Sequence, residues 1–306
     1  MQFSAWHKFR QWLEIRQKIA AAAGVVSLAP YEDYRCLKFR RERGVLFVTI
    51  DHPPLNLLDQ GLLEELGRIA TDIARDDEVL VAVFDSADPD FFISHADVRD
   101  IENMPRVAPP KPTSHQGTYA LYDRYRKLSK VTIARIEGVA RGGGSEFALS
   151  LDLRFGAIGK AVLGQQELSV GLIPGGGATQ WLPRLIGRAR TLEVLLSCGD
   201  YPAELAQQYG YINRAVDPKH IGSVVDDLAY RIATYPAEAI ARMKRAVQAS
   251  ELPLDQGLLE EAHLFNQAVA SDVARRRMAK YFELGGQTRE VDLDMNFMAD
   301  ILAKIQ

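Results

Sequence analysis

The chain has 306 residues, of which 47% are hydrophobic and 25% charged, so it can bury one large core or two moderate ones and is expected to be globular. Its formal net charge of -3 creates no overall field that would attract nucleic acid, which we therefore exclude as a partner. The two cysteines, Cys36 and Cys198, are too few for a disulfide framework or a cysteine-based zinc site and favour a reducing, cytoplasmic location.

Residues 1–34 are predicted to form a helical extension in front of the core. Trp6, Phe9, Leu13 and Ile19 approximate one face of an amphipathic helix. A helix that packs on the body of the protein or on a neighbouring subunit explains this pattern better than a membrane-surface anchor or a signal peptide. No stretch reaches the ~18–20 uninterrupted apolar residues of a membrane span, so we expect none.

Residues 35–217 are predicted to form a strand-rich core. Alternating apolar residues predict a hairpin with one strand near Arg35–Arg40, a turn at Glu42–Gly44 and a second strand at Val45–Ile50. The next segment, "LDQGLLEELGRIATDIARD", has apolar residues at helical spacing, and "EVLVAVFDS" is a short apolar strand. The order is therefore strand, strand, helix, strand.

The middle of the core contains the proline-rich segment "PRVAPPKPTS". Four prolines forbid a helix there and favour an exposed, extended connection that can serve as a lid. A helix resumes at "QGTYALYDRYRKL" and is followed by the strand "KVTIARIEG" and a glycine-rich stretch. We expect these glycines at the carboxyl end of that strand, where sheet-based enzymes tend to bind ligands.

Residues 218–306 are predicted to be a helical carboxyl-terminal domain. Four helical patterns follow one another, separated at Pro236, Pro253 and Ser271, and no strand pattern intervenes. The final segment, "QTREVDLDMNFMADILAKIQ", is expected to be an additional amphipathic helix that serves packing rather than binding. No repeat of fixed period is present.

The glycine-rich stretch reads "GVARGGGSEFALSLDL" and spans Gly138–Leu153. Glycine inside regular structure destabilises by about 0.5–1 kcal/mol relative to alanine, so three in a row indicate a sharp turn or a close approach. The stretch lacks the Lys-Ser/Thr ending of a P-loop and the G-x-G-x-x-G pattern of a dinucleotide site. An oxyanion hole built from backbone N–H groups at a helix start fits better, and a plain tight connection is the alternative.

Four segments in this order, namely "DHPPLNLLD", "DFFISHADVRDI", the glycine stretch and "VLGQQELSVGLIPGGGATQWLPRLIG", resemble the crotonase (enoyl-CoA hydratase/isomerase) superfamily. The resemblance covers roughly residues 35–284. It implies an α/β fold, with a crotonase-like core of repeated strand-strand-helix turns and a carboxyl-terminal helical trimerisation region. It also implies an acyl-CoA thioester as the partner, coenzyme A as part of the substrate with no separate cofactor, and a homotrimer or dimer of trimers.

The resemblance assigns roles to particular residues. By motif position, the backbone N–H groups of Ala96 and Gly143 would form an oxyanion hole for the thioester carbonyl. Glu146 and Glu167 occupy the positions of the two hydratase glutamates, which makes Glu146 the base that activates water and Glu167 the acid. Residues expected at the substrate or its CoA part are Leu57, Ser94, His95, Asp97, Arg99, Gly142 and Phe282.

Two residues depart from the family pattern. Gln166 replaces the usual proline, and one extra residue separates the two glutamates. His95 replaces a glycine, so it would be strained if that position needs a positive φ, and it either acts as a third proton-transfer group or packs beside the CoA. The first hypothesis is hydration of a 2-enoyl-CoA. The alternatives are another crotonase-type reaction (isomerase, decarboxylase or thioester hydrolase) and a non-catalytic acyl-CoA-binding subunit.

No metal site is expected. The six histidines are scattered, and no cluster of histidines and carboxylates has the spacing of metal ligands.

Overall fold

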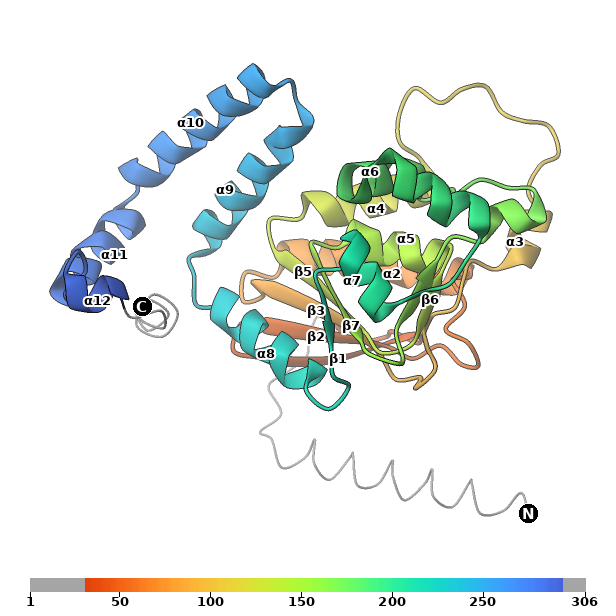
Figure 1. Ribbon diagram of the computed structural model, residues 1–306, viewed down its shortest axis with the longest axis horizontal. Coiled ribbons are helices and arrows are strands. Elements are labelled where there is room, and N and C mark those ends of the chain that lie inside the picture. The colour runs from red at the N-terminus through yellow and green to blue at the C-terminus, as the bar shows by residue number, and fades with distance from the viewer. Residues whose placement is uncertain (1–30, 294–306) are drawn as a thin grey trace, which may run out of the picture. The chain divides into compact units, whose positions relative to one another are not determined.

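The computed structural model describes residues 31–293 (Figure 1). The chain divides into two compact units, Met1–Asp33 and Tyr34–Gln306. The predicted amino-terminal helix through Trp6 and Ile19 lies outside the described residues, as does most of the final amphipathic segment. The three-domain division made from the sequence stays a prediction.

Between residues 31 and 293, ten strands form two sheets. The six-stranded sheet has the order β1 (Leu37–Glu42), β2 (Val45–Ile50), β3 (Val81–Ser86), β5 (Val131–Ile136), β7 (Leu153–Ala157), β10 (Arg214–Val216). The four-stranded sheet has the order β4 (Phe91–Ile93), β6 (Val139–Arg141), β8 (Val162–Gly164), β9 (Tyr201–Pro202). Apart from the antiparallel pairs β1–β2 and β8–β9, neighbouring strands run parallel.

The helices lie between and after these strands. In the core they are α2 (Gln60–Arg75), α3 (Val98–Glu102), α4 (Gly117–Lys127), α5 (Gly143–Ser150), the short helix η1 (Glu167–Val170), α6 (Ala178–Ser197) and α7 (Ala203–Tyr209). The remaining ones are α8 (Ile221–Ile232), α9 (Ala237–Gln248), the short helix η2 (Ala249–Glu251), α10 (Leu254–Ala270), α11 (Asp272–Glu283) and α12 (Arg289–Leu293).

The repeated strand-strand-helix turns are present. The pairs β3 and β4, β5 and β6, and β7 and β8 each give their first strand to the six-stranded sheet and their second to the four-stranded sheet. A helix follows each pair before the next begins. The predicted α/β fold of repeated strand-strand-helix turns is therefore confirmed, and trimerisation through the carboxyl-terminal helices stays a prediction.

The hairpin is confirmed with one change. Its first strand begins at Leu37 instead of Arg35, because the N–H groups of Arg35 and Cys36 donate to the Glu65 carboxylate at 2.7 and 2.8 Å. The turn is shorter than predicted, with Arg43 and Gly44 both at positive φ. Two such residues match the right-handed twist of the flanking strands.

The three consecutive glycines, Gly142–Gly144, do not follow β5 directly, although the sequence predicted them at the carboxyl end of that strand. A bend at Gly138 leads from β5 into the three-residue strand β6 of the other sheet, and β6 comes before these glycines. A Cβ at Gly138 would lie 2.6 Å from the Asp90 carbonyl, so only glycine permits this approach. Three residues are too few to show the alternation by which strands are recognised.

Side chains of the central strands are buried on both faces of the six-stranded sheet. Val83 packs toward α8 with Phe47 and Val225. Phe84 points to the opposite face, where its ring contacts Tyr125 of α4 and Phe147 of α5. Burial on both faces is typical of parallel sheets and holds α5 rigidly over the strands.

The carboxyl-terminal helices begin where the sequence predicted. Helices α9, α10 and α11 start directly after Pro236, Pro253 and Ser271, and the Ser271 hydroxyl accepts a hydrogen bond from the Ala274 N–H at 3.2 Å. No strand occurs among the described residues after β10. The proline-rich segment is exposed and non-helical, as expected.

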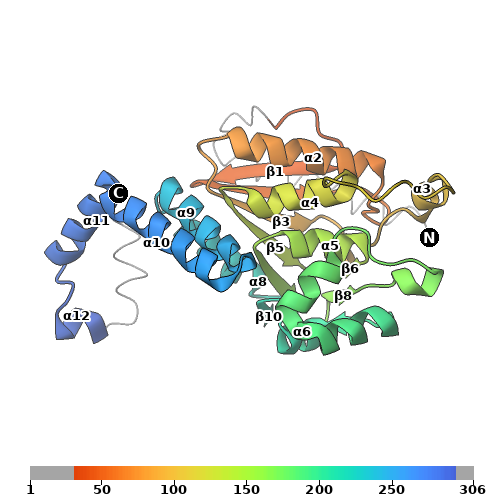
Figure 2. The same ribbon diagram turned by 90° about the horizontal axis from the view of Figure 1, so that it is seen from above.

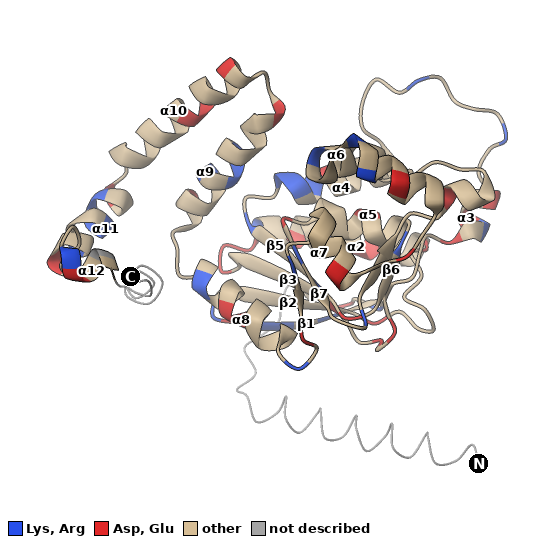
Figure 3. Cartoon of the chain, in the orientation of Figure 1, with Lys and Arg blue, Asp and Glu red and all other residues tan. Residues whose placement is uncertain are grey.

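Charged residues are spread over the described elements. Figure 3 shows basic and acidic residues interspersed along the chain. Within residues 31–293, none of the helices combines the length and the apolar character needed to cross a bilayer.

Candidate active site

Three neighbouring parallel strands end at one edge of the four-stranded sheet. Strand β6 pairs with β4 on one side and with β8 on the other. After β4 the chain continues into Ser94–Ala96, after β6 into Gly142–Gly143, and after β8 into Gln165–Glu167. Figures 1 and 2 show α5 next to β6. Topology thus brings together residues that the sequence separates widely.

The glycines have distinct roles in this arrangement. Gly142 has φ +46°, a conformation that other L-residues rarely adopt. A Cβ at Gly144 would lie 2.2 Å from the Ile93 carbonyl oxygen, so this glycine lets α5 press against the end of β4. The stretch is therefore a sharp turn and a close approach at once.

Ala96 and Gly143 lie side by side. A Cβ built on Gly143 would be 3.5 Å from the Ala96 nitrogen. Leu58 donates to the His95 carbonyl at 2.9 Å and accepts from the Asp97 N–H at 3.0 Å, so the N–H of Ala96 faces away from Leu58. Gly143 is the first residue of α5, where an N–H has no intrahelical acceptor. Within the described part of the chain, neither N–H donates to a protein acceptor.

Glu146 is buried in the first turn of α5 and is only 3% exposed. Its Oε1 accepts hydrogen bonds from the N–H groups of Gly176 at 2.7 Å and Ala178 at 3.0 Å. Burial raises the pKa of Glu146 to about 7, while these N–H groups lower it and the charge of Glu167 raises it. A carboxyl with this pKa exchanges protons readily near neutral pH.

Glu167 begins η1 and is half-buried. A Cβ on Gly142 would lie 3.0 Å from its Oε1, which places this carboxyl against the backbone that precedes α5. Burial raises the pKa of Glu167. The amide of Gln165, oriented by its neighbours, donates to both Glu167 oxygens at 3.2 and 3.3 Å. The two predicted glutamates therefore belong to one site, which we call the glutamate site together with Ala96, Gly142 and Gly143.

Sequence reasoning missed several residues that shape this site. Gly176 and Ala178 belong to the quoted segment "IPGGGATQ", but nothing in it showed that their N–H groups would hold Glu146. Tyr122 of α4 is buried, and its hydroxyl donates to the Gly143 carbonyl at 2.9 Å. Its ring carbon Cε2 would lie 2.6 Å from a Cβ on Gly176. Tyr122 therefore touches the backbone on both sides of Glu146.

The other residues predicted on β4 and its continuation lie beside the glutamate site. Ser94 is buried, and its hydroxyl has no hydrogen-bond partner among the described residues. His95 is exposed, its Nδ1 lies 2.8 Å from the Ala96 carbonyl oxygen, and its φ is not positive. The condition for strain at His95, a positive φ, is therefore not met. Asp97 caps α3 by accepting from the Arg99 N–H at 2.8 Å, and Arg99 is exposed.

Two further predicted residues differ in their placement. Leu57 is half-buried next to Leu58, the residue that pairs with Ala96. Phe282 is 54% exposed on α11, a helix whose main packing partner is α10. The single chain therefore brings Leu57 close to the site but not Phe282.

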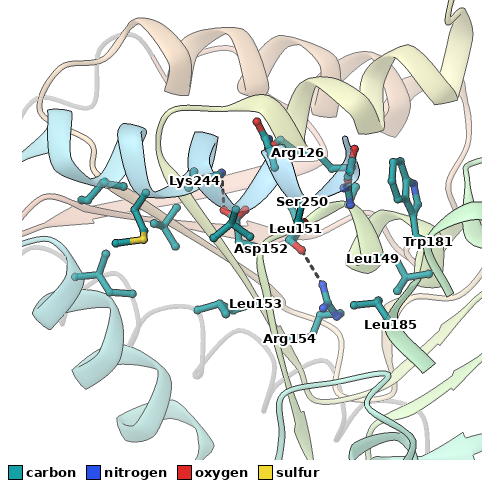
Figure 4. Close-up of a pocket in the computed structure, with 18 of the residues that line it drawn as sticks. Arg126, Leu149, Leu151, Asp152, Leu153, Arg154, Trp181, Leu185, Lys244 and Ser250 are labelled. Carbon is teal, nitrogen blue, oxygen red and sulfur yellow. Dashed lines mark hydrogen bonds and ion pairs between the residues drawn. The ribbon is translucent and has the colours of Figure 1, made fainter. Parts of the chain in front are cut away.

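A separate cavity of about 990 Å³ lies between α6 and α9, and we call it the α6–α9 cavity. None of the predicted site residues lines it. Figure 4 shows Lys244 paired with Asp152, and Arg154 donating to the Leu151 carbonyl. Its other walls are largely apolar, including Leu149, Leu153, Trp181, Leu185, Ile240, Met243 and Val247.

No cluster of three or more potential metal ligands is present among residues 31–293.

The chain is similar to several known proteins. A family model described as enoyl-CoA hydratase/isomerase matches residues 40–288. The short-chain-enoyl-CoA hydratase of Clostridium acetobutylicum is 29% identical over 245 residues, which cover 79% of this chain and 93% of that protein. The fatty acid oxidation complex subunit alpha of Idiomarina loihiensis is 33% identical over 179 residues, or 58% of this chain and 25% of that protein.

A solved structure gives the same result. The enoyl-CoA hydratase from Bacillus anthracis matches with a TM-score of 0.74 and 26% identity, over 82% of this chain and 97% of that one. The residues that the family model matches include every residue of the glutamate site.

Proposed function

Because the chain belongs to the enoyl-CoA hydratase/isomerase family, we propose that it is a crotonase-type acyl-CoA enzyme and that its reaction is hydration of a 2-enoyl-CoA. One observation carries the choice of hydration. Two carboxyls, Glu146 and Glu167, meet beside unpaired backbone N–H groups, and burial raises the pKa of both. A binding subunit has no need of a buried carboxyl held near neutrality.

In the proposed reaction, the N–H groups of Ala96 and Gly143 hold the thioester oxygen. Glu146 takes a proton from water as the water oxygen bonds to the β-carbon. The electron pair of the double bond moves toward the thioester, and the resulting enolate charge is stabilised by the two N–H groups. Glu167 then gives its proton to the α-carbon, which completes the addition of water. Each N–H donor of this kind contributes about 2.7–4 kcal/mol to the transition state.

Burial suits Glu146 to the role of base. Its Oε1 is fixed by two N–H groups, which leaves Oε2 to accept a proton from water. Glu167 is less buried and lies against Gly142 on the other side of the α5 start. We propose that Arg99 contacts the phosphates of CoA, and that Phe282 reaches a neighbouring subunit in a homotrimer or dimer of trimers.

The test is a panel of CoA thioesters followed by mass spectrometry. Incubation with crotonyl-CoA or a longer 2-enoyl-CoA is expected to add the mass of one water and to remove the enoyl-thioester absorbance. Release of carbon dioxide or of free CoA would instead identify another crotonase-type reaction. Loss of the enoyl-thioester absorbance without a mass change would indicate an isomerase, and binding with neither change would leave a non-catalytic acyl-CoA-binding subunit.

A further inference from the structure

The Asp200 carboxylate joins two segments of the glutamate site. Arg141 donates to it twice, from Nε to Oδ1 at 2.7 Å and from Nη2 to Oδ2 at 2.6 Å. Gln166 donates from its side-chain amide to the same Oδ1 at 3.3 Å. Bidentate guanidinium–carboxylate pairs are the strong and geometrically specific ones, and Arg141 is only 27% exposed.

The positions of these residues give the contact its meaning. Arg141 ends β6 and immediately precedes Gly142, whereas Gln166 immediately precedes Glu167. Asp200 comes from a third segment, between α6 and β9. The Asp200 carboxylate thus connects the backbone that leads into Gly143 to the turn that carries Glu167.

The backbone is built to bring Asp200 to this place. Arg141 pairs with Gly164 across the sheet, and the Gly142 N–H donates to the Gly164 carbonyl at 2.9 Å. A Cβ on Gly164 would lie 2.8 Å from the Gly199 carbonyl oxygen and 3.6 Å from the Asp200 Oδ1. The absence of a side chain at Gly164 therefore lets the Gly199–Asp200 turn press against β8.

Gln166 stands where the family pattern has a proline, so the turn that carries Glu167 is restrained in a different way. A proline would hold φ at about -65°, but Gln166 has φ -107° and its ring-free backbone can rotate. Its side chain instead binds Asp200, so a contact between side chains takes over the restraint that a proline ring would provide.

We propose that Arg141, Asp200 and Gln166 form a clamp that holds the Glu167 turn in register with Gly142 and Gly143. These three are positioning residues, since none of them needs to touch the substrate. The clamp rests on the proposed role of Glu167 as the proton donor. Its function is to keep the Glu167 carboxyl at a fixed distance from the carbonyl oxygen that the N–H groups hold, because small misplacements of a proton donor are costly in rate.

The test compares Asp200→Asn with Glu238→Gln. Glu238 pairs with Arg242 on α9, and Arg242 is 25% exposed, close to the value for Arg141, so this control also removes one carboxylate from a partly exposed ion pair. We expect Asp200→Asn to lower kcat about tenfold with KM changed less than about twofold, and the control to change neither.

Amide hydrogen exchange of the peptide spanning residues 165–172 gives a readout that needs no turnover. Asp200→Asn is expected to speed its exchange at least about threefold, since the turn then opens more often. Unchanged exchange in Asp200→Asn overturns the clamp, whatever the activity. A rise in KM with unchanged kcat also overturns it, because the pair would then contact substrate.

The two hypotheses fail in different ways. If the parent protein hydrates no enoyl thioester but exchange responds as expected, the proposed function is wrong and the restraint on the turn stands. If Asp200→Asn does not fold, Arg141→Met removes the same ion pair and keeps the carboxylate, and the same two measurements decide.

Discussion

The glutamate site and the α6–α9 cavity both contain partly buried charges, but they satisfy them differently. In the cavity, Asp152 accepts from the Lys244 ammonium at 2.7 Å and from Thr132, so a cation neutralises it. In the glutamate site, the donors to Glu146 are backbone N–H groups, and a second carboxyl lies nearby. The Asp152 charge is engaged in an ion pair, whereas a carboxyl with a pKa near 7 can change its protonation state during a reaction.

The comparison shows why volume is a poor guide to function here. The cavity is large, yet its charged groups are occupied with one another: Arg126 pairs with Glu251, and Arg154 donates to the carbonyls of Leu151 and Tyr211. The glutamate site lies where β4, β6 and β8 end, and the N–H groups of Ala96 and Gly143 have no protein acceptor there among the described residues. We expect catalysis where carboxyls and N–H groups are free to contact a substrate, and the following variants test that expectation.

The largest effect on turnover is expected at the backbone N–H groups of Ala96 and Gly143. Gly143→Pro removes one N–H, and proline is tolerated at the first position of a helix, so α5 can still form. We expect turnover to fall about 10²–10³-fold, the cost of losing one oxyanion donor. Gly143→Ala is the matched control, because its Cβ makes the same contact with Leu58 and Ala96 but the N–H remains.

Steady-state kinetics on both folded variants separates the two causes. A Gly143→Ala protein as inactive as Gly143→Pro would assign the loss to crowding against Leu58 rather than to the missing donor.

The next effect concerns stability and pH. Folding raises the pKa of Glu146 from 4.5 to about 7, so between these values the native state binds more protons than the unfolded state. The free energy of unfolding therefore falls as pH rises through this window. Between about pH 5.5 and about pH 8 the free energy of unfolding is expected to fall by about 2 kcal/mol because of Glu146.

Glu146→Gln removes that dependence and is expected to be more stable than the parent protein at the higher pH only. Urea unfolding at about pH 5.5 and about pH 8 measures the stability of each variant. Glu238→Gln is the control and should show no gain in stability at the higher pH. An equal effect of Glu146→Gln at both pH values would argue against a raised pKa.

A smaller effect is expected at Tyr122. Tyr122 and Tyr125 both lie on α4, both are buried, and both donate their hydroxyl to a backbone carbonyl, at 2.9 Å to Gly143 and at 2.8 Å to Leu66. Each Tyr→Phe change should cost about 1 kcal/mol of stability. Only Tyr122→Phe is expected to lower kcat, by about fivefold, since it alone loosens the backbone beside Glu146. Equal losses of kcat in the two variants would show that the effect comes from core packing.

The smallest effect is expected at His95. Its side chain is exposed and its φ is not positive, so neither proton transfer nor strain relief is required of it. We expect His95→Gly to keep kcat within about threefold of the parent protein. A loss of about a hundredfold or more in a folded variant, measured on the same substrate, would place His95 among the catalytic residues.

Much of this site follows from residue order, and the rest depends on contacts that no local pattern encodes. Gly142, Gly143 and Glu146 lie within one five-residue segment, so their place at a strand-to-helix junction was predictable from the glycines. Strand β6 was missed because three residues carry no periodicity. Gly176, Tyr122 and Asp200 reach the site only through tertiary packing, and their contacts could not be inferred without the topology of the four-stranded sheet.

The central claim is that chemistry resides at the glutamate site and not in the α6–α9 cavity. Two matched carboxyl-to-amide changes, Glu146→Gln and Asp152→Asn, test it in one assay: incubation of each folded variant and the parent protein with the same 2-enoyl-CoA, followed by the mass of the product. The account predicts that the parent protein and Asp152→Asn add one water, whereas Glu146→Gln does so about 10²–10⁴ times more slowly. Undiminished hydration by Glu146→Gln, together with its loss in Asp152→Asn, would contradict the account.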